Sequence, residues 1–348
     1  MKAWVFKRKG DPAVVLKIEQ DWPKPNPSKG QVLVKVRAVS LNPVGWKAMG
    51  MPPISWMQKA PAIPESDISG VVEGGDLSGT GLEVGDAVFG IVPADSIMKS
   101  GQGVLAEYAL VKKDLLTKKP ENVSFEEACS FPLTTFTTQW SLEAAGLRKG
   151  SGQRVFINGG SGGVGVYAIQ LAKAYGAYVV TTCSPPSRKL VESLGPDEVL
   201  DYKEKNIVDQ LSERFPAKEK PFDIIYDTVG HEPQLFWQSA KYLSRTGTFV
   251  DIAGPPMEGG FGALLSATGD LFQRYLRPAW LGGVPTKYTF GFMVPSQENL
   301  REMAQFIAEG KLKPVLDEVF PFEQALRAYD RQKSGRSKGK VVISLVDA

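Results

Sequence analysis

Apolar and polar residues alternate over short runs in the first third of the chain, and Gly and Pro separate these runs. Residues 31–38, QVLVKVRA, place Val32, Val34, Val36 and Ala38 on one face, which predicts a half-buried antiparallel strand. The same reasoning predicts short strands at 2–7, 68–73, 84–90 and 104–111. The chain therefore begins with a β-rich domain.

The pattern changes at residue 154. Residues 154–157 form a short apolar run, a glycine cluster follows, and apolar residues then recur at helical spacing from Val164 to Tyr175. Further strands are expected at 177–182, 198–201, 222–227 and 248–252, separated by helices near 187–194, 205–214 and 232–243. This strand–helix alternation predicts an α/β domain with a doubly wound parallel sheet.

The glycine cluster lies between the first strand and the first helix of this second domain. Gly160, Gly162 and Gly165 satisfy the pattern G-x-G-x-x-G, which lets the backbone turn sharply and approach a pyrophosphate at a helix N-terminus. A glycine run alone is equally typical of a flexible loop. The strand–helix units that follow favour the dinucleotide-binding interpretation, a Rossmann domain.

The end of the second strand indicates which dinucleotide is bound. An NAD site usually places an Asp or Glu there, but residues 181–189 read TTCSPPSRK and contain neither. Hydroxyls and cations suit the 2′-phosphate of NADPH, whereas a carboxylate would repel it. The expected contacts are Ser184, Ser187, Arg188 and Tyr202. The alternative for Arg188 and Lys189 is the solvated start of a helix.

The last third of the chain adds three elements. Residues 257–283 contain Phe272, Tyr275, Leu276 and Trp280, which predict a helix that either overhangs a substrate site or covers the core. A sixth strand is expected at 287–293 and an amphipathic helix at 297–309.

Composition argues against several classes of protein. The 348 residues are 43% hydrophobic and 23% charged with a net charge of +3, as in an ordinary soluble enzyme, and no basic stripe indicates nucleic acid or anionic membrane. The N-terminal residues lack the apolar stretch of a signal peptide, so a cytosolic protein is expected. The sequence contains two cysteines, Cys129 and Cys183, and one histidine, His231. This small number of thiol and imidazole ligands argues against a zinc site. His231 lies either near the cofactor or simply at the surface.

Several stretches together resemble one family. They are PAIPESDISGVV at 61–72, GLEVGDAVFG at 81–90, AEYALVKKDLLTKKPENVSFEEACSFPLT at 106–134, NGGSGGVG at 158–165 and GKLKPVLDEVFPFEQALRAYDRQKSGRSKGKVV at 310–342. The sequence resembles the medium-chain dehydrogenase/reductase superfamily, in its zinc-free quinone oxidoreductase and enoyl reductase branch. The resemblance implies a GroES-like catalytic domain at 1–126 and 313–348 and a Rossmann NADPH-binding domain at 127–312.

The resemblance also implies roles for individual residues. Asn42 would lie near the nicotinamide ribose, Thr137 would touch the cofactor beside the active site, and Lys340 would reach back to the cofactor. The pyrophosphate would be held by Ser161, Gly162, Gly163 and Val164, and the nicotinamide side lined by Val229, Gly230, Ala253 and Gly254.

One stretch departs from the family. Many relatives carry N-P-x-D followed by an aromatic hydroxyl that can act as an acid, but residues 42–50 read NPVGWKAMG, so Gly45 stands at the Asp position and no Tyr follows. Lys47 is the candidate proton donor; alternatively it is a solvated residue and water protonates the product. Trp46, Trp56 and Met57 form either an apolar pocket wall or part of the core.

Two functions remain. The first is a zinc-independent NADPH-dependent reductase of enones, enals, enoyl thioesters or quinones. The alternative is an NADPH-binding regulatory or partner protein with weak or no reductase activity. Either a monomer or a homodimer is compatible with the sequence. A carrier-bound substrate is a further alternative, since Lys112, Lys113, Lys118 and Lys119 could contact an acidic carrier protein or could form a solvated loop.

Overall fold

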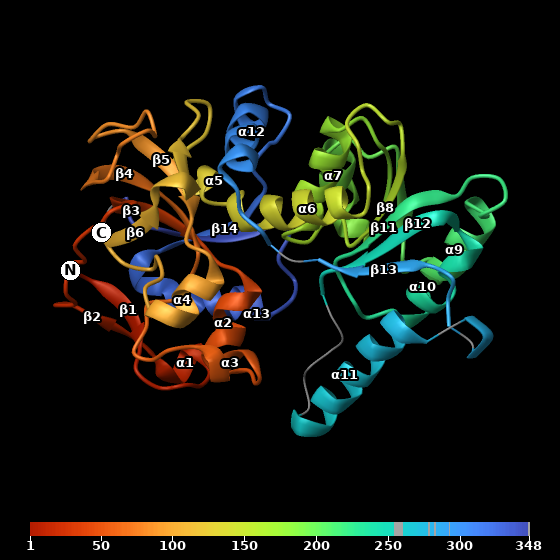
Figure 1. Ribbon diagram of the computed structural model, residues 1–348, viewed down its shortest axis with the longest axis horizontal. Helices are drawn as coiled ribbons and strands as arrows, with labels where there is room; N and C mark the ends of the chain where they lie inside the picture. The colour runs from red at the N-terminus through yellow and green to blue at the C-terminus, as the bar shows by residue number, and fades with distance from the viewer. Residues whose placement is uncertain (254–259, 278, 282, 292, 347–348) are drawn as a thin grey trace. The chain divides into compact units, whose positions relative to one another are not determined.

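The computed structural model describes residues 1–253, 260–277, 279–281, 283–291 and 293–346 (Figure 1). Side chains within 260–267 and at 279 are not described. The chain folds as two compact units, residues 1–136 with 295–348 and residues 137–294. The domain boundaries at 126 and 312 that the sequence predicts stay a prediction. Within the described residues, no helix is long and apolar enough to span a membrane.

The first unit is built on a mixed sheet of seven strands. Its order is β14-β15-β3-β4-β5-β7, and β6 pairs with β3. The strands are β3 (Gln31–Ser40), β4 (Asp67–Gly75), β5 (Ala87–Ile91), β6 (Tyr108–Lys112), β7 (Leu116–Lys118), β14 (Leu316–Pro321) and β15 (Lys340–Ser344). A separate antiparallel pair joins β1 (Ala3–Phe6) and β2 (Leu16–Glu19). Val32, Val34 and Val36 of β3 are buried as predicted, but Leu33 and Val39 on the opposite face are buried as well.

Short helices cover this sheet. They are α1 (Pro12–Val15), α2 (Pro43–Gly50), α3 (Ile54–Met57), α4 (Ala94–Ser100), α5 (Phe125–Ala128), α12 (Gln297–Ala308) and α13 (Ala325–Lys333), with 3₁₀ turns η1 (Lys113–Leu115) and η5 (Phe322–Gln324). The predicted amphipathic helix is α12, which buries Leu300, Met303 and Ile307. Asn122 donates a hydrogen bond to the Ile307 carbonyl at 2.8 Å, so α12 belongs to this unit.

The second unit contains a parallel sheet of six strands in the order β10-β9-β8-β11-β12-β13. This is the strand order of a dinucleotide-binding fold, whose topological switch point lies between β8 and β11. The strands are β8 (Arg154–Asn158), β9 (Tyr178–Cys183), β10 (Glu198–Asp201), β11 (Phe222–Asp227), β12 (Leu243–Asp251) and β13 (Lys287–Phe290). The α/β fold class with a GroES-like and a Rossmann-like sheet is therefore confirmed.

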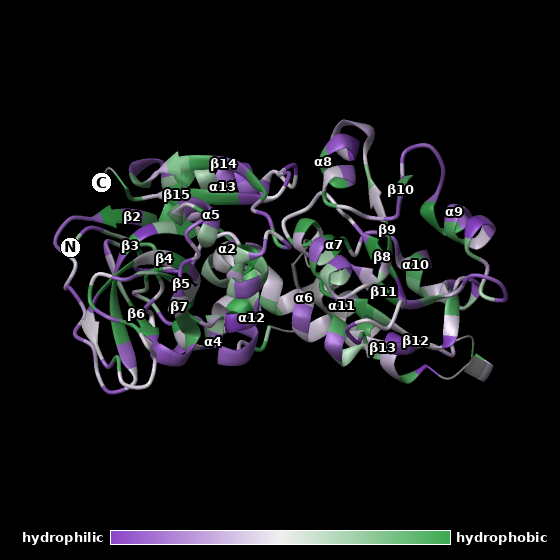
Figure 2. Cartoon of the chain, turned by 90° about the horizontal axis from the view of Figure 1, so that it is seen from above, coloured by the Kyte–Doolittle hydropathy of each residue, from purple (hydrophilic) through white to green (hydrophobic). Residues whose placement is uncertain are grey.

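Helices connect the parallel strands. They are α6 (Pro132–Ala144), which begins in the first unit, α7 (Gly165–Ala174), α8 (Arg188–Ser193), α9 (Ile207–Arg214), α10 (Pro233–Trp237) and α11 (Gly260–Leu276), with 3₁₀ turns η2 (Pro185–Ser187), η3 (Ser239–Lys241) and η4 (Ala279–Leu281). Figure 2 shows α9 with one hydrophobic and one hydrophilic side; it buries Ile207 and Leu211. Its apolar side joins a core rich in aromatic rings, including Phe156, Phe222 and Phe249.

Two elements differ from the sequence-based expectation. The strand expected at 104–111 begins only at Tyr108, because the buried backbone before it pairs with β1, where the Trp4 N–H donates to the Leu105 carbonyl. The helix expected at 232–243 ends at Trp237, and β12 begins at Leu243, which pairs with Phe222.

The helix expected at 257–283 is α11, and residues 257–259 lie outside the described part. Leu271 packs on the core of the second unit, whereas Phe272, Leu276 and Trp280 are exposed. Tyr275, half exposed, meets the ring of the core residue Tyr288 with 4.8 Å between ring centres, so the described side chains of this segment include both packed and exposed residues.

Candidate functional site

The glycine turn between β8 and α7 is shaped by steric limits. A Cβ on Gly160 would lie 2.3 Å from Thr181 Oγ1, and a Cβ on Gly165 would lie 2.1 Å from the Gly159 carbonyl oxygen. Gly162 differs, because a Cβ built there would lie 3.5 Å from its nearest neighbour, the Gly159 carbonyl oxygen, which is an ordinary contact distance. The first and third glycines thus permit close packing of the chain, and the second leaves room for a ligand to approach the backbone.

A buried polar network fixes the strand ends around this turn. The Gly159 N–H donates to Thr182 Oγ1 at 2.8 Å, and Thr182 Oγ1 donates to Asn158 Oδ1 at 2.8 Å. Asn158 Nδ2 donates to Asp227 Oδ1 at 2.9 Å, and the same oxygen accepts the Val229 N–H at 3.0 Å. The network therefore ties together the carboxyl ends of β9, β8 and β11 at the switch point.

Sequence reasoning missed Asn158, Thr182 and Asp227 as site-shaping residues. The available signal was a polar residue at the end of each apolar strand. A polar residue at the end of a buried strand indicates a local hydrogen-bond network, because a buried polar side chain needs a hydrogen-bonding partner.

The residues expected at the 2′-phosphate follow β9. Arg188 is exposed, and its Nε donates to Glu192 Oε1 at 2.8 Å along α8. Tyr202 is half exposed and Ser184 is half buried, whereas Ser187 is only 3% exposed. Arg188 and Tyr202 are thus accessible to a ligand, and contact through the Ser187 side chain would require local movement.

The other expected cofactor contacts, apart from Asn42 and Lys340, also belong to the second unit. Ser161, Gly163 and Val164 are partly exposed around the turn, Val229 is 37% exposed, and Gly230 is buried with a φ of +71°. Ala253 and Thr137 are partly buried, and His231 is exposed. Gly254 lies outside the described residues.

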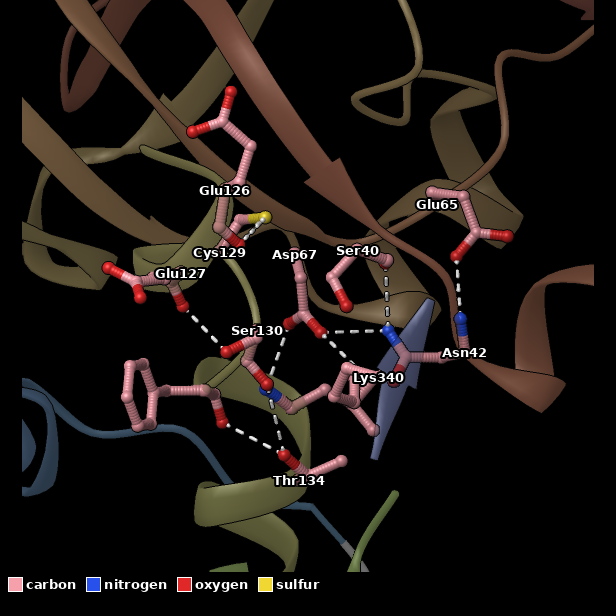
Figure 3. Close-up of polar contacts among 12 residues, drawn as sticks. Ser40, Asn42, Glu65, Asp67, Glu126, Glu127, Cys129, Ser130, Thr134 and Lys340 are labelled. Atoms are coloured by element: carbon pink, nitrogen blue, oxygen red, sulfur yellow. Dashed lines mark hydrogen bonds and ion pairs between the residues drawn. The ribbon is translucent and has the colours of Figure 1, made fainter. Parts of the chain in front are cut away.

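The first unit contains a buried cluster around Asn42 (Figure 3). Asn42 Nδ2 donates to Asp67 Oδ2 at 2.8 Å, and Lys340 Nζ donates to Asn42 Oδ1 at 2.5 Å and lies 3.4 Å from Asp67 Oδ2. Asn42, Asp67 and Lys340 are each at most 3% exposed. Adjacent strands bring them together, because Ser40 of β3 pairs with Asp67 of β4 and with Val342 of β15.

The Asp67 carboxyl is the acidic centre of this cluster. Burial raises its pKa, while Lys340 and the hydrogen bond from Asn42 act in the opposite direction. Its second oxygen accepts the Leu133 N–H at 2.8 Å. Sequence reasoning assigned Lys340 to the cofactor and did not identify its pairing with Asp67, although an acid at the start of an apolar strand was a usable signal.

Glu65 is a second buried carboxyl that sequence reasoning missed. Its Oε2 accepts the Asn42 backbone N–H at 3.1 Å, and its Oε1 accepts the Tyr329 hydroxyl hydrogen at 2.7 Å. Burial raises the pKa of Glu65 to about 8, against the opposing effect of these hydrogen bonds and of Lys340. The chain at Glu65 has a φ of +71°.

The remaining candidates lie on α2 and α3. Lys47 is partly buried, and its Nζ lies 5.8 Å from the centre of the Trp46 ring. Trp56 and Met57 are 64% and 71% exposed, so they are not core residues.

The donor atoms of this chain do not fit a zinc site. The sequence offers two thiols and one imidazole, and both Cys129 and Cys183 are buried. Across the part of the chain that the structure describes, no group of three His, Cys, Asp or Glu residues is arranged to hold a metal ion. Burial raises the pKa of both thiols, which disfavours the thiolate that zinc binds.

The sequence also matches known families and proteins. A family model described as zinc-binding dehydrogenase matches residues 194–343, and one described as the alcohol dehydrogenase GroES-like domain matches residues 28–121. The trans-enoyl reductase pgmF of Aspergillus terreus (strain NIH 2624 / FGSC A1156) is 33% identical, over 99% of this chain and 96% of its own.

Two solved structures share the fold over nearly all of both chains. The quinone oxidoreductase of Coxiella burnetii is 28% identical with a TM-score of 0.79, covering 99% of each chain. The quinone oxidoreductase of Thermus thermophilus, which was also solved in complex with NADPH, is 27% identical with a TM-score of 0.72, covering 99% of this chain and 100% of its own. The chain therefore belongs to the medium-chain dehydrogenase/reductase superfamily, in its quinone oxidoreductase and enoyl reductase branch.

Proposed function

We propose that the protein is a zinc-independent, NADPH-dependent reductase of an activated C=C bond or a quinone. The observation that carries the proposal is the turn after β8, where Gly160 and Gly165 permit close packing and a Cβ at Gly162 would make only an ordinary contact, at 3.5 Å from the Gly159 carbonyl oxygen. The names of the relatives support a reductase, and one of the solved relatives binds NADPH.

Residues of the second unit would hold the dinucleotide. The backbone from Ser161 to Val164 would hold the pyrophosphate at the N-terminus of α7, and Val229, Gly230, Ala253 and Gly254 would line the nicotinamide side. Residues 181–189 contain no carboxylate, so Ser184, Arg188 and Tyr202 would favour the 2′-phosphate, and Ser187, which is buried, would contact it only after local movement. NADPH would supply the hydride; the chain supplies binding, orientation and electrostatics.

The first unit would supply polar groups that orient the cofactor and stabilise charge on the substrate. Asn42 is held by Asp67 and Lys340, so its amide is fixed in orientation before any ligand binds. Lys47 on α2 is the proposed hydrogen-bond donor to a developing enolate oxygen. Thr137 of α6, in the second unit, is a further proposed cofactor contact. If Lys47 does not act in this way, water supplies the final proton.

A free small molecule is the proposed substrate. Lys113 pairs with Asp76 and Lys118 with Asp86, and Lys119 Nζ donates to the Pro120 carbonyl at 3.0 Å. These internal partners make the basic run a poor surface for an acidic carrier protein, although Lys112 is exposed. A monomer and a homodimer are both compatible with this proposal.

The test is NADPH oxidation by the full chain with a quinone, an aromatic enone, an enal and an enoyl thioester, with NADH in parallel. Faster NADPH consumption with one acceptor, together with its reduced product, supports the reductase. An enoyl group on a carrier protein, compared with the same group on a short thiol, separates carrier-bound from free substrates.

The second candidate is an NADPH-binding protein with weak or no reductase activity. The observation that favours it is Gly45, which replaces the acidic residue found in many relatives. Tight NADPH binding without reduction of any acceptor would support this candidate, and failure to bind either dinucleotide would refute both.

A further inference from the structure

The N-terminus of α2 uses an unusual arrangement to satisfy its first backbone N–H groups. Asn42 is the N-cap residue, but its side chain makes no capping hydrogen bond because it is directed to Asp67 and Lys340. In a capping box, an acidic or amide side chain at the third helical position accepts the N–H of the N-cap residue. That position is Gly45, which has no side chain to do this.

Glu65 makes this bond from a different segment. Its Oε2 accepts the Asn42 N–H at 3.1 Å. A Cβ built on Gly45 would lie 2.0 Å from Glu65 Oε1 and 3.0 Å from Oε2, so the carboxyl group fills the volume that a side chain at position 45 would occupy. A larger residue at 45 and the observed position of Glu65 are mutually exclusive.

The backbone at Glu65 is also unusual. Its φ of +71° is in the left-handed region, and no other non-glycine residue in the described chain has a positive φ. Such a conformation costs free energy in a residue with a Cβ and persists only where surrounding contacts offset it. The contacts here are the hydrogen bonds to Asn42 and Tyr329.

We propose that Glu65 is a positioning residue, which replaces from outside the helix the acidic side chain missing at Gly45 and so fixes Asn42. The proposal rests on the proposed function, because Asn42 matters there as a cofactor contact. Glu65 also joins α2 to α13 through Tyr329, and Asp67 of β4 and Lys340 of β15 are the charged groups that act on it electrostatically.

A double-mutant cycle on the full chain tests the pairing of the two positions. Gly45 lies within α2 without a positive φ, so Gly45→Ala would by itself favour the helix. In the wild-type background it should instead lower Tm by about 3 °C, because the Glu65 carboxyl must turn away and lose both hydrogen bonds. In a Glu65→Gly background the same change should leave Tm unchanged or raise it. Equal effects of Gly45→Ala in the two backgrounds would overturn the pairing.

Moving the carboxyl group tests the positioning role. Gly45→Asp and Glu65→Gly should each lower kcat about tenfold, and the double variant should recover to within about threefold of wild type. NADPH affinity, measured by the fluorescence of NADPH, should likewise be lower in both single variants and recover in the double variant. If the double variant folds with the wild-type Tm yet recovers neither kcat nor NADPH affinity, Glu65 has only a structural role and the proposal fails.

The two proposals fail in different ways. The Tm cycle and NADPH binding do not depend on turnover. A wild-type protein that reduces no acceptor would refute the reductase, while the pairing of Gly45 and Glu65 would still be measured. Additive Tm effects in an active reductase would instead overturn the pairing of Gly45 and Glu65 and leave the proposed reductase standing.

Discussion

Arg274 Nη1 donates to Asp251 Oδ2 at 3.2 Å, and both side chains are almost fully buried. This contact connects α11 to the end of β12, and Tyr288 donates to the same carboxylate oxygen at 3.1 Å. The guanidinium also lies 5.4 Å from the centre of the Phe236 ring. Arg274 is thus a buried cationic partner that α11 supplies to Asp251.

Arg274→Ala should destabilise the second unit strongly, by about 3–5 kcal/mol, because it leaves the Asp251 carboxylate buried without its cationic partner. Urea unfolding of the full chain measures this. Arg245→Ala, at an exposed position of β12, is the control and should change stability by less than about 0.5 kcal/mol. Equal stability of the two variants would contradict the structural role of the pair.

Glu65 predicts a specific dependence of stability on pH. Its pKa is raised from 4.5 to about 8 in the folded protein, so the folded state holds a proton that the unfolded state releases between these values. The resulting stabilisation is complete below the unfolded pKa and is lost as the pH rises through about 8. Glu65→Gln lacks this pH-dependent stabilisation, because a glutamine side chain does not titrate.

Thermal unfolding of the wild type and of Glu65→Gln from about pH 5 to pH 9 measures the effect. The Tm of the wild type should fall relative to that of the variant as the pH rises. A constant difference across this window would show that Glu65 titrates near its ordinary pKa.

Gly162 predicts a separation of binding from folding. Gly162→Val should lower NADPH affinity at least about tenfold, because its methyl groups would occupy the place proposed for the pyrophosphate, and Tm should change little, since an added Cβ meets only the Gly159 carbonyl oxygen, at 3.5 Å. Gly269→Ala in α11, where an added Cβ meets no atom within 4 Å, is the control and should bind NADPH normally. Unchanged NADPH affinity in the Gly162 variant would contradict the assigned pyrophosphate site.

Arg188 predicts cofactor selectivity. Arg188→Ala should weaken NADPH binding about tenfold and leave NADH binding unchanged, because the guanidinium would contact only the 2′-phosphate. Arg245→Ala, at an exposed position of β12, is the control. Titration of both dinucleotides with each variant measures the ratio; a parallel loss for NADH and NADPH would exclude a 2′-phosphate contact.

Lys47 predicts a change in kcat. Lys47→Ala should lower kcat about tenfold or more if the ammonium group stabilises an enolate oxygen, with little change in NADPH affinity. Lys59→Ala, an exposed lysine beyond α3, is the control. Full activity of the Lys47 variant would leave water as the source of the proton.

The sequence predicted the parallel sheet well, because each strand there is a short apolar run followed by turn residues, as in residues 222–227. The glycine turn was equally readable, since its spacing is local. Helix α2 was not predicted, because its eight residues include two glycines and a proline and carry little periodicity.

The buried acids were harder to identify. Asp67 meets Asn42 and Lys340 only because strands distant in sequence pair side by side. Glu65 is still less predictable: its carboxyl matters because of the space left at Gly45, and a positive φ at Glu65 is not encoded in any local pattern. The spacing of residues along the chain does not predict such contacts.

The pairing of β15 with β3 has a consequence for biosynthesis. The hydrogen bond between Lys340 and Asn42 joins residues 298 positions apart, and every strand of the parallel sheet lies between them in sequence. A ribosome therefore synthesises the entire parallel sheet before the residue that neutralises Asp67 becomes available. The dinucleotide-binding unit can begin to form during synthesis, whereas the acidic cluster of the first unit is completed only after Lys340 has been added.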